Sequence, residues 1–262
     1  MTQHLIDTHA HLDMDDFDSD RDTVLSRAQA AGVEKIVTVG IDVASSRKAI
    51  ELADKYPWIY PAVGVHPHDA RTVEWADISR LRELAAHPKV VAIGEIGLDF
   101  YRNMSPKEKQ LQVVNWQLDL AAETNLPVII HARQAAHEAV SMLSEWVQRK
   151  SSPTYTPRGV IHCFSEDENI ARQYLRLGFM ISFAGYVSYP SSKAALIAKS
   201  IPIDRIMVET DSPFLPPQSY RGKRCEPSYV AITASVLANA FGMPVEEFAR
   251  KTTENARRLF RI

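Results

Sequence analysis

The stretch HLIDTHAHLD, residues 4–13, joins a short apolar run to two histidines, His9 and His11. A run of this length predicts a buried strand. Alternate residues of a strand face the same side, so both imidazoles are expected to point inward together. Burying two histidines side by side is unfavourable without a partner, and a shared metal ion is one such partner. The stretch alone therefore indicates a possible metal site at the end of a first strand.

The pattern of this first strand recurs along the chain. Each apolar run is followed by a polar or Gly/Pro-marked turn and then by a segment with helical periodicity. Alternating β and α elements predict a parallel sheet, and eight units with nearly continuous apolar strands predict closure into a TIM (β/α)8 barrel. The predicted strands occupy residues 5–9, 35–40, 59–65, 90–94, 127–131, 159–163, 179–183 and 205–209.

A doubly wound open sheet is the alternative α/β fold. No Gly-x-Gly-x-x-Gly or phosphate-loop motif follows any of the strands, which favours the barrel. The segment SSPTYTP, 151–157, is expected to be a loop too short to divide domains, so residues 1–262 are predicted to form a single domain.

Composition limits the classes of partner. The chain has 30 basic and 32 acidic residues, a net charge of −2, so it lacks the broad basic surface that holds duplex DNA. Two cysteines are too few for a disulfide framework. The N-terminus does not resemble a signal peptide, and no apolar stretch approaches the roughly 18 residues of a membrane helix. We expect a cytoplasmic protein without membrane association or an obligate protein partner.

Polar residues gather where the predicted strands end. Active sites of parallel barrels lie at this end, and six of the nine histidines fall there. The residues in question are His9, His11, His66, His68, Glu95, His131, Arg133, His162, Glu209 and Asp211.

The imidazoles and carboxylates of this set are the side chains that bind divalent metal ions such as Zn²⁺, Mg²⁺ or Mn²⁺. Glu209 and Asp211 repeat the i, i+2 spacing on the last strand, which lies beside the first strand in a closed barrel. Glu95 lies between this group and a second, nitrogen-rich group, so its two oxygens can bridge two ions. The predicted ligands are His9, His11, Glu95, His131, His162 and Asp211.

Other residues near the strand ends receive weaker assignments. His66 exceeds the ligand count and is expected to contact substrate or support a ligand. His68 is expected in a loop, and Asp99 can either form a local salt bridge or orient a ligand. Cys163 is expected to point away from the site and to pack inertly.

Cationic and aromatic residues at the same end are candidate substrate contacts. Arg133 follows His131 on the same face, and a guanidinium suits phosphate oxygens. The loop 220–227 brings Arg221 and Arg224 towards the rim. Aromatic rings there can stack on bases, as in proteins that hold single strands. Those rings are Tyr101, Phe214 and Tyr220.

The chain resembles the TatD family of metal-dependent deoxyribonucleases from residue 6 to residue 260. The resemblance is carried by the motifs IDTHAHLD, GVHPH, GEIGLDFY, PVIIHAR, IHCF, VETDSPFLPP, RGKRCEPSYV and TTENARRLF. It implies a TIM barrel of the amidohydrolase-like metal-dependent hydrolase superfamily. It also implies one ion at His9, His11, Glu95 and Asp211, a second at Glu95, His131 and His162, and Glu209 and His66 beside them.

The expected reaction is hydrolysis of DNA phosphodiester bonds, as an exonuclease acting on single strands or strand ends rather than intact duplex. Either Asp211 or Glu209 is expected to accept the proton of the attacking water. A C–N hydrolase of the cyclic-amide or deaminase type is an alternative on the same barrel, although Glu95 stands where some of those enzymes use a modified lysine. A non-catalytic metal-binding module is the other alternative.

Overall fold

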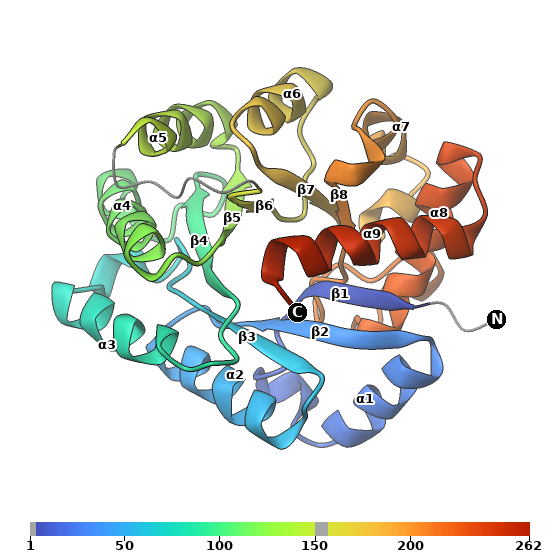
Figure 1. Cartoon of the computed structure of the whole chain (residues 1–262), viewed down its shortest axis with the longest axis horizontal. Coiled ribbons are helices and arrows are strands. Elements are labelled where there is room, and N and C mark those ends of the chain that lie inside the picture. Colours follow the sequence, from blue (N-terminus) through green and yellow to red (C-terminus); the bar gives the residue numbers. More distant parts are fainter. Residues whose placement is uncertain (1–3, 150–156) are drawn as a thin grey trace.

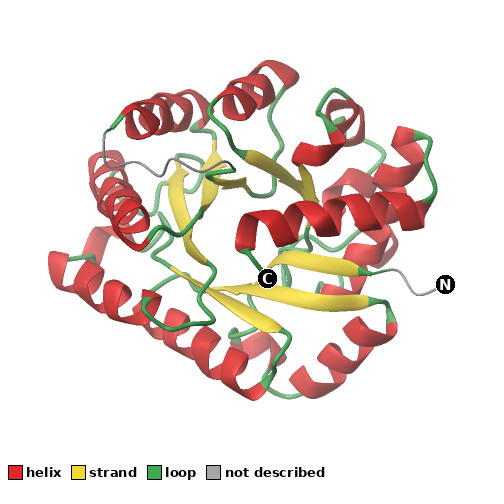
Figure 2. Ribbon diagram, viewed as in Figure 1, coloured by secondary structure: helices red, strands yellow, loops and turns green. Residues whose placement is uncertain are grey.

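The computed structural model describes residues 4–149 and 157–262 and contains a parallel eight-stranded barrel (Figures 1 and 2). The strands follow one another in chain order around the sheet. They are β1 Leu5–Ala10, β2 Val33–Val39, β3 Ile59–Val63, β4 Ala92–Asp99, β5 Val128–Arg133, β6 Gly159–Ile161, β7 Met180–Phe183 and β8 Ile206–Val208. The predicted barrel is therefore confirmed. The predicted loop at 151–157 lies outside the described residues except for Pro157.

Closure of the barrel depends on the segment just after β8. The His11 amide donates to the Ser212 carbonyl at 2.7 Å, and the Asp211 amide donates to the His9 carbonyl at 2.9 Å. These bonds place the end of the last strand against the end of the first. The pair His9 and His11 is thus next to the pair Glu209 and Asp211 in space, as the i, i+2 spacing of both predicted.

Helices surround the barrel, one or more after each strand (Figure 2). Their ends carry the expected signals: the Asp42 carboxylate accepts the Ser45 amide at 2.6 Å at the start of α2, and α8 ends at Gly242 with φ 66°. The helices are α1 Arg21–Ala30, α2 Val43–Lys55, α3 Trp75–Ala85, α4 Lys107–Thr124, α5 Ala136–Gln148, α6 Glu168–Arg176, α7 Ala194–Lys199, α8 Val230–Phe241 and α9 Val245–Phe260.

Helix α9 covers the N-terminal mouth of the barrel (Figure 1). Leu259 and Phe260 pack with apolar strand residues inside the barrel, among them Ile6 and Met207. The Asn255 amide donates to the carbonyl of Ile206, where β8 begins, at 2.7 Å. With this mouth covered, the opposite mouth, at the C-terminal strand ends, is left for chemistry.

Strand β4 differs from its prediction, because it continues to Asp99 instead of ending at residue 94. Its pairing with β5 is irregular between Ile93 and Ile96 and then continues as far as Asp99 and Arg133. Gly97 has φ 143°, and a Cβ there would lie 2.0 Å from the His131 carbonyl oxygen. Glycine therefore permits the close approach of the two strands that carry Glu95 and His131.

Within the described ranges, no single helix is long and apolar enough to cross a membrane. The pair Pro227–Phe241 and Val245–Phe260 reaches that length and apolar character only when both are taken together, and it is bent by 111°.

Candidate metal centre

The six predicted ligands lie together at the C-terminal mouth of the barrel. They come from β1, β4 and β5 and from the segments directly after β1, β6 and β8. All are buried except His131, which is partly exposed. The structure therefore brings together the whole predicted ligand set, whose members are His9, His11, Glu95, His131, His162 and Asp211.

The carboxylate of Glu95 faces a different histidine group with each oxygen. Its Oε2 lies 3.4 Å from Nε2 of His9 and 3.6 Å from Nε2 of His11. Its Oε1 lies 2.8 Å from Nδ1 of His131 and 2.7 Å from Nε2 of His162. The side chain is therefore placed between two nitrogen-rich groups, as the sequence predicted.

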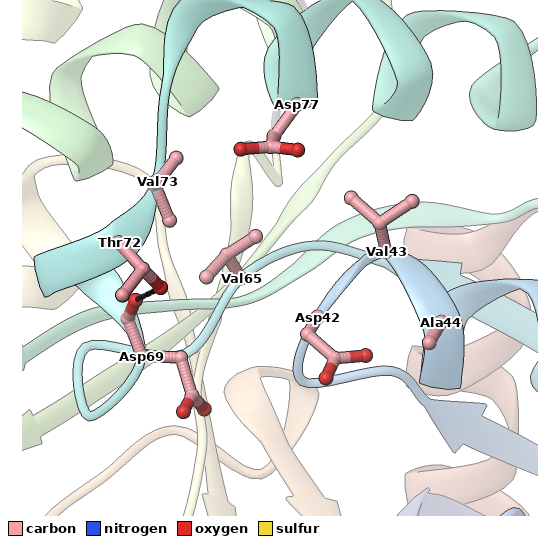
Figure 3. Close-up of a pocket in the computed structure, with 8 residues that line it drawn as sticks. All are labelled: Asp42, Val43, Ala44, Val65, Asp69, Thr72, Val73 and Asp77. Carbon is pink, nitrogen blue, oxygen red and sulfur yellow. Dashed lines mark hydrogen bonds between the residues drawn. The ribbon is translucent and has the colours of Figure 1, made fainter.

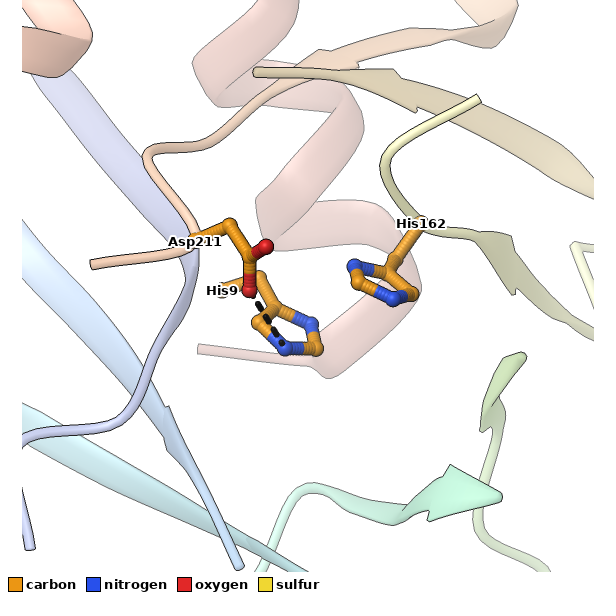
Figure 4. Close-up of side chains that lie close together, drawn as sticks. All are labelled: His9, His162 and Asp211. Carbon is orange, nitrogen blue, oxygen red and sulfur yellow. Dashed lines mark ion pairs between the residues drawn. The ribbon is translucent and has the colours of Figure 1, made fainter. Parts of the chain in front are cut away.

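Asp211 completes the side of the site that faces β1. Its Oδ1 lies 3.5 Å from Nε2 of His11. The same oxygen lies 3.7 Å from Nε2 of His9, and Figure 4 shows this pair. The His9 ring stacks on the His162 ring with centroids 4.0 Å apart. Asp211 has φ 58°, a left-handed conformation that aspartate tolerates better than most residues. This turn directs its carboxylate back towards the end of β1.

The donor atoms fit divalent metal ions. Nitrogens with lone pairs converge, with His9 Nε2 3.2 Å from His11 Nε2 and His131 Nδ1 3.2 Å from His162 Nε2. Neutral imidazoles and carboxylates together suit Zn²⁺ and similar ions. Three groups have ligand atoms within 4.8 Å of one another: His9, His11 and Glu95; His66, Glu95 and His131; and His9, His162 and Asp211.

His66 lies closer to the ligands than the sequence indicated. Its Nε2 is 3.5 Å from Oε1 of Glu95, and it belongs to one of the three ligand groups. The sequence set it apart only because six other residues already met the expected ligand count. Its position makes His66 a further candidate ligand.

Burial and mutual charge shift the protonation of the site. Burial alone would raise the pKa of Glu95, but positive charge on His162 and His66 and hydrogen bonds from His131 and His162 lower it well below its usual value. Burial opposes protonation of His11, yet the carboxylates of Asp211 and Glu95 raise its pKa to about 9. Burial lowers the pKa of His66 to about 4 despite the nearby Glu95. The metal-free site thus holds both neutral and charged imidazoles at neutral pH.

Asp99 orients His131 from behind. Its Oδ2 lies 3.1 Å from Nε2 of His131 and 2.9 Å from Nε2 of His68. Its Oδ1 accepts the amides of Tyr101 and Arg102 at 3.0 and 2.8 Å. Of the two roles open for Asp99, the structure favours that of orienting a ligand, since the bond at Nε2 leaves Nδ1 of His131 directed at Glu95.

Glu209 is held beside the ligands by the segment after β6. Its Oε1 accepts the Cys163 amide at 2.6 Å and lies 3.4 Å from Nδ1 of His162. Its Oε2 is buried and has no hydrogen-bond partner among the residues described. One oxygen is therefore fixed, and the other remains available to a water or a proton.

The expectation that Cys163 points away from the site is wrong. Cys163 has φ 47°, so the chain turns out of strand geometry directly after His162, and strand alternation no longer applies. Cys163 then lines a pocket together with His162 and Asp211.

Two pockets open at the ligands. The large pocket, about 570 Å³, lies towards β1, β3 and β4, and the small pocket, about 220 Å³, lies towards β6 and β7. Both are lined by Arg133, whose guanidinium carbon lies 4.0 Å from the centre of the Tyr101 ring. Arg133 therefore lies at the site as predicted, and Tyr101 reaches it only through its contact with Arg133. Arg102 and Met104, which the sequence patterns did not single out, also line the large pocket.

The arginines of the loop 220–227 are placed differently from the expectation. Arg224 pairs with Asp20 at 2.7 Å and with Glu226 at 3.2 Å, and its guanidinium lies over the Phe17 ring. Arg221 is exposed, and neither arginine lines the two pockets at the ligands. The partner Asp20 lies far away in the sequence, so this use of Arg224 had no local signal.

Of the predicted aromatic contacts, some lie at the metal centre and one does not. Phe214 is about half exposed and lines the large pocket, with its ring centre 5.9 Å from that of His11. The Tyr220 ring instead stacks on Tyr229 at 4.0 Å. Tyr101 and Phe214 therefore stand at the mouth of the site, and Tyr220 serves the packing of its own loop.

A separate pocket of about 240 Å³ lies near the starts of α2 and α3, and three carboxylates face it (Figure 3). Asp42 caps α2 through the Ser45 amide, and Asp77 accepts the Glu74 amide at 2.9 Å before α3. Burial and the charge of Asp42 raise the pKa of Asp69. Two of the three carboxylates therefore stabilise helix starts rather than gathering around a ligand.

Comparisons with known proteins agree with this site. The sequence model described as TatD related DNase matches residues 6–261. The metal-dependent hydrolase YabD of Bacillus subtilis (strain 168) is 44% identical over 259 residues, 98% of this chain and 99% of that protein. The 3'-5' ssDNA/RNA exonuclease TatD of Pectobacterium carotovorum subsp. carotovorum (strain PC1) is 36% identical over 98% of this chain and 100% of that protein. The crystal structure of the TatD homolog YJJV from Escherichia coli K12 superposes with a TM-score of 0.92 and 30% identity over 100% of both chains.

Proposed function

The chain belongs to the TatD-related DNase family and is a metal-dependent hydrolase, and from this premise we propose that it is a deoxyribonuclease that removes nucleotides from single-stranded ends. The observation that carries the proposal is the placement of Glu95, whose Oε2 faces His9 and His11 while its Oε1 faces His131 and His162. Carboxylates in this position bridge the ions of two-metal phosphodiesterase sites.

Two divalent ions, Zn²⁺, Mg²⁺ or Mn²⁺, are proposed to bind at these groups. His9, His11, Glu95 and Asp211 would hold one, and Glu95, His131 and His162 would hold the other, with His66 near Oε1 of Glu95. When bound, such ions lower the pKa of a water and stabilise charge on phosphoryl oxygens.

The protein's own residues have distinct tasks in hydrolysis. Asp211, at the pocket wall, and Glu209, with its unpartnered Oε2, are the two candidate acceptors for the proton of the attacking water. Arg133 lines both pockets and is proposed to bind a phosphate oxygen. Asp99 contacts Nε2 of His131 and so keeps Nδ1 of the same ring directed at Glu95.

The substrate is proposed to be nucleic acid presented as a single strand. The Pectobacterium relative is named for ssDNA/RNA exonuclease activity. The net charge of −2 gives no basic surface for duplex, and Tyr101 and Phe214 offer exposed rings beside the pocket mouth. We further propose that residues 1–262 act as one domain, in the cytoplasm, without an obligate protein partner.

A cyclic-amide or deaminase-type hydrolase remains the second candidate, because the barrel also supports C–N chemistry. Some such enzymes bridge their ions with a modified lysine. No lysine lines either pocket at the ligands within the described part of the chain, and Glu95 occupies the bridging place. This observation favours ester hydrolysis, and it also speaks against a purely structural ion, which needs a closed set of ligands.

The test is cleavage of end-labelled single- and double-stranded DNA with Mg²⁺ or Mn²⁺, and with EDTA. We expect metal-dependent shortening of the single strand that is lost in Glu95→Ala and kept in Glu51→Gln, a control on the exposed face of α2. Absence of cleavage together with turnover of a cyclic amide would overturn the proposal.

A further inference from the structure

The two pockets at the metal centre meet at one wall. The large and small pockets share five lining residues from the ends of β5, β6 and β8, namely His131, Arg133, His162, Asp211 and Leu215. A phosphodiester has two ester arms. If its phosphorus lies at this shared wall, one arm extends into each pocket.

The two pockets differ in size and in chemistry. The large pocket has Phe214 and Met104 at an exposed apolar mouth, which suits a nucleobase. The small pocket has less than half that volume, and Ser165 and Tyr186, which carry hydroxyls, line it together with Arg133. Hydroxyl and guanidinium donors match the oxygens of a sugar-phosphate better than the face of a base.

Tyr186 has the feature expected of a ligand contact. Its hydroxyl is buried and has no hydrogen-bond partner within residues 4–149 and 157–262. A buried hydroxyl without a partner is unfavourable, so its retention calls for an acceptor that arrives with a ligand. The Tyr186 ring packs partly against the hydrophobic core, which fixes the direction of the hydroxyl.

The backbone keeps Tyr186 beside the shared wall. Tyr186 lies in the short helix Gly185–Ser188 after β7. A Cβ on Gly185 would lie 2.7 Å from the Leu215 carbonyl oxygen, so the two loops touch through their backbones. The small pocket is therefore a built cavity rather than a gap between side chains that move independently.

We propose that the small pocket is a sugar-phosphate subsite and that the Tyr186 hydroxyl donates to an oxygen of the sugar-phosphate on the side of the scissile bond opposite the large pocket. The inference rests on the proposed phosphodiesterase function. It assigns to Tyr186 a role in selecting nucleotide substrates over simple phosphodiesters.

The test compares Tyr186→Phe with the wild-type protein on two substrates. One is a single-stranded oligonucleotide, and the other is bis(p-nitrophenyl) phosphate, which has no sugar. We expect kcat/KM for the oligonucleotide to fall about 5- to 20-fold, since one hydrogen bond is lost, and kcat/KM for the aryl ester to change less than about 2-fold.

Two further measurements separate binding from structure. 2-Deoxyribose 5-phosphate should inhibit aryl-ester hydrolysis about 5-fold more weakly in Tyr186→Phe, while inhibition by inorganic phosphate stays the same. Tm should stay equal or rise, because the variant loses a hydroxyl that has no partner in the free protein. Tyr189→Phe is the matched control, because the Tyr189 hydroxyl donates to the Pro216 carbonyl at 2.7 Å. Loss of this hydrogen bond should lower Tm. It should leave unchanged the ratio of kcat/KM for the oligonucleotide to kcat/KM for the aryl ester.

Equal losses on both substrates, no loss on either, or a fall in Tm like that of Tyr189→Phe would overturn the subsite. Failure of the wild-type protein to cleave either substrate would instead refute the proposed function itself.

Discussion

Asp99 and His131 form a pair in which a carboxylate on one strand fixes the ring of a candidate ligand on the next. Asp99 Oδ2 lies 3.1 Å from His131 Nε2, and backbone amides hold Asp99 Oδ1. The carboxylate therefore cannot turn away without losing several hydrogen bonds. The ring orientation of His131 is set in the protein fold, before any ion binds.

Replacing Asp99 should weaken metal binding. For Asp99→Ala we expect divalent-metal affinity to fall about 10- to 100-fold, the usual effect of removing the partner of a ligating histidine. Competition with a chromophoric chelator measures it. Asp119→Ala, on the exposed side of α4, is the control, and an unchanged affinity in Asp99→Ala would contradict the orienting role.

Metal affinity should rise with pH because His11 must lose a proton to bind. Burial disfavours the charged imidazole, but Asp211 and Glu95 raise the pKa of His11 to about 9. Affinity should therefore increase about tenfold per pH unit below that value if one proton is released. Calorimetry in buffers of different ionisation enthalpy measures the proton release, and His66, with its pKa at about 4, should contribute none near pH 7.

The same group gives a stability prediction for the metal-free protein. Because the pKa of His11 is raised from 6.5, its contribution to folding is fully present below about pH 6.5 and is lost as pH rises through about 9. Added metal should therefore raise Tm more at pH 8.5 than at pH 6. A metal-induced shift in Tm that does not vary with pH would contradict this assignment.

Cys163 should tolerate glycine better than valine. Its φ of 47° is a left-handed conformation that costs a β-branched residue about 1–3 kcal/mol and glycine little. Cysteine already bears part of this cost, so Cys163→Val should lower the free energy of unfolding by less than that amount but more than Cys163→Gly does. The valine should also reduce kcat by displacing the amide that holds Glu209. Urea denaturation measures the free energy of unfolding, and steady-state kinetics measures kcat. Equal unfolding free energies for Cys163→Val and Cys163→Gly would contradict the explanation from the left-handed backbone conformation.

Replacing Arg224 should affect mainly the stability of the protein, and replacing Arg133 should affect mainly substrate binding. Arg224→Ala removes the pairs with Asp20 and Glu226 and should lower the free energy of unfolding by about 1–2 kcal/mol with little change in KM. Arg133→Ala should raise KM for single-stranded DNA with little change in unfolding. If Arg224→Ala instead raised KM without changing the free energy of unfolding, Arg224 would have to contact the substrate.

The sequence was sufficient to predict the barrel and the gathering of the candidate ligands at one mouth of it, because both depend on local periodicity. Apolar runs mark the strands, and His9, His11 and Asp211 occupy strand ends that meet whatever the details of packing. The extension of β4 was not predictable, because it depends on the close approach of β5 at Gly97.

The positions that sequence reasoning missed depend on contacts between distant segments. Arg224 binds Asp20, which lies on the other side of the barrel closure, and Cys163 leaves strand geometry to reach Glu209. Neither contact leaves a pattern within its own segment. The gathering of the candidate ligands was thus predictable from the sequence, whereas the contacts of Arg224 and Cys163 were not.

Helix α9 covers the interior of the barrel and follows all eight strands in the chain. Its Thr253 hydroxyl donates to the His4 carbonyl at 2.7 Å, and Leu259 and Phe260 fill the interior against β1 and β8. During synthesis this helix leaves the ribosome after all eight strands. The apolar strand residues that Leu259 and Phe260 cover can therefore be buried only after α9 has emerged.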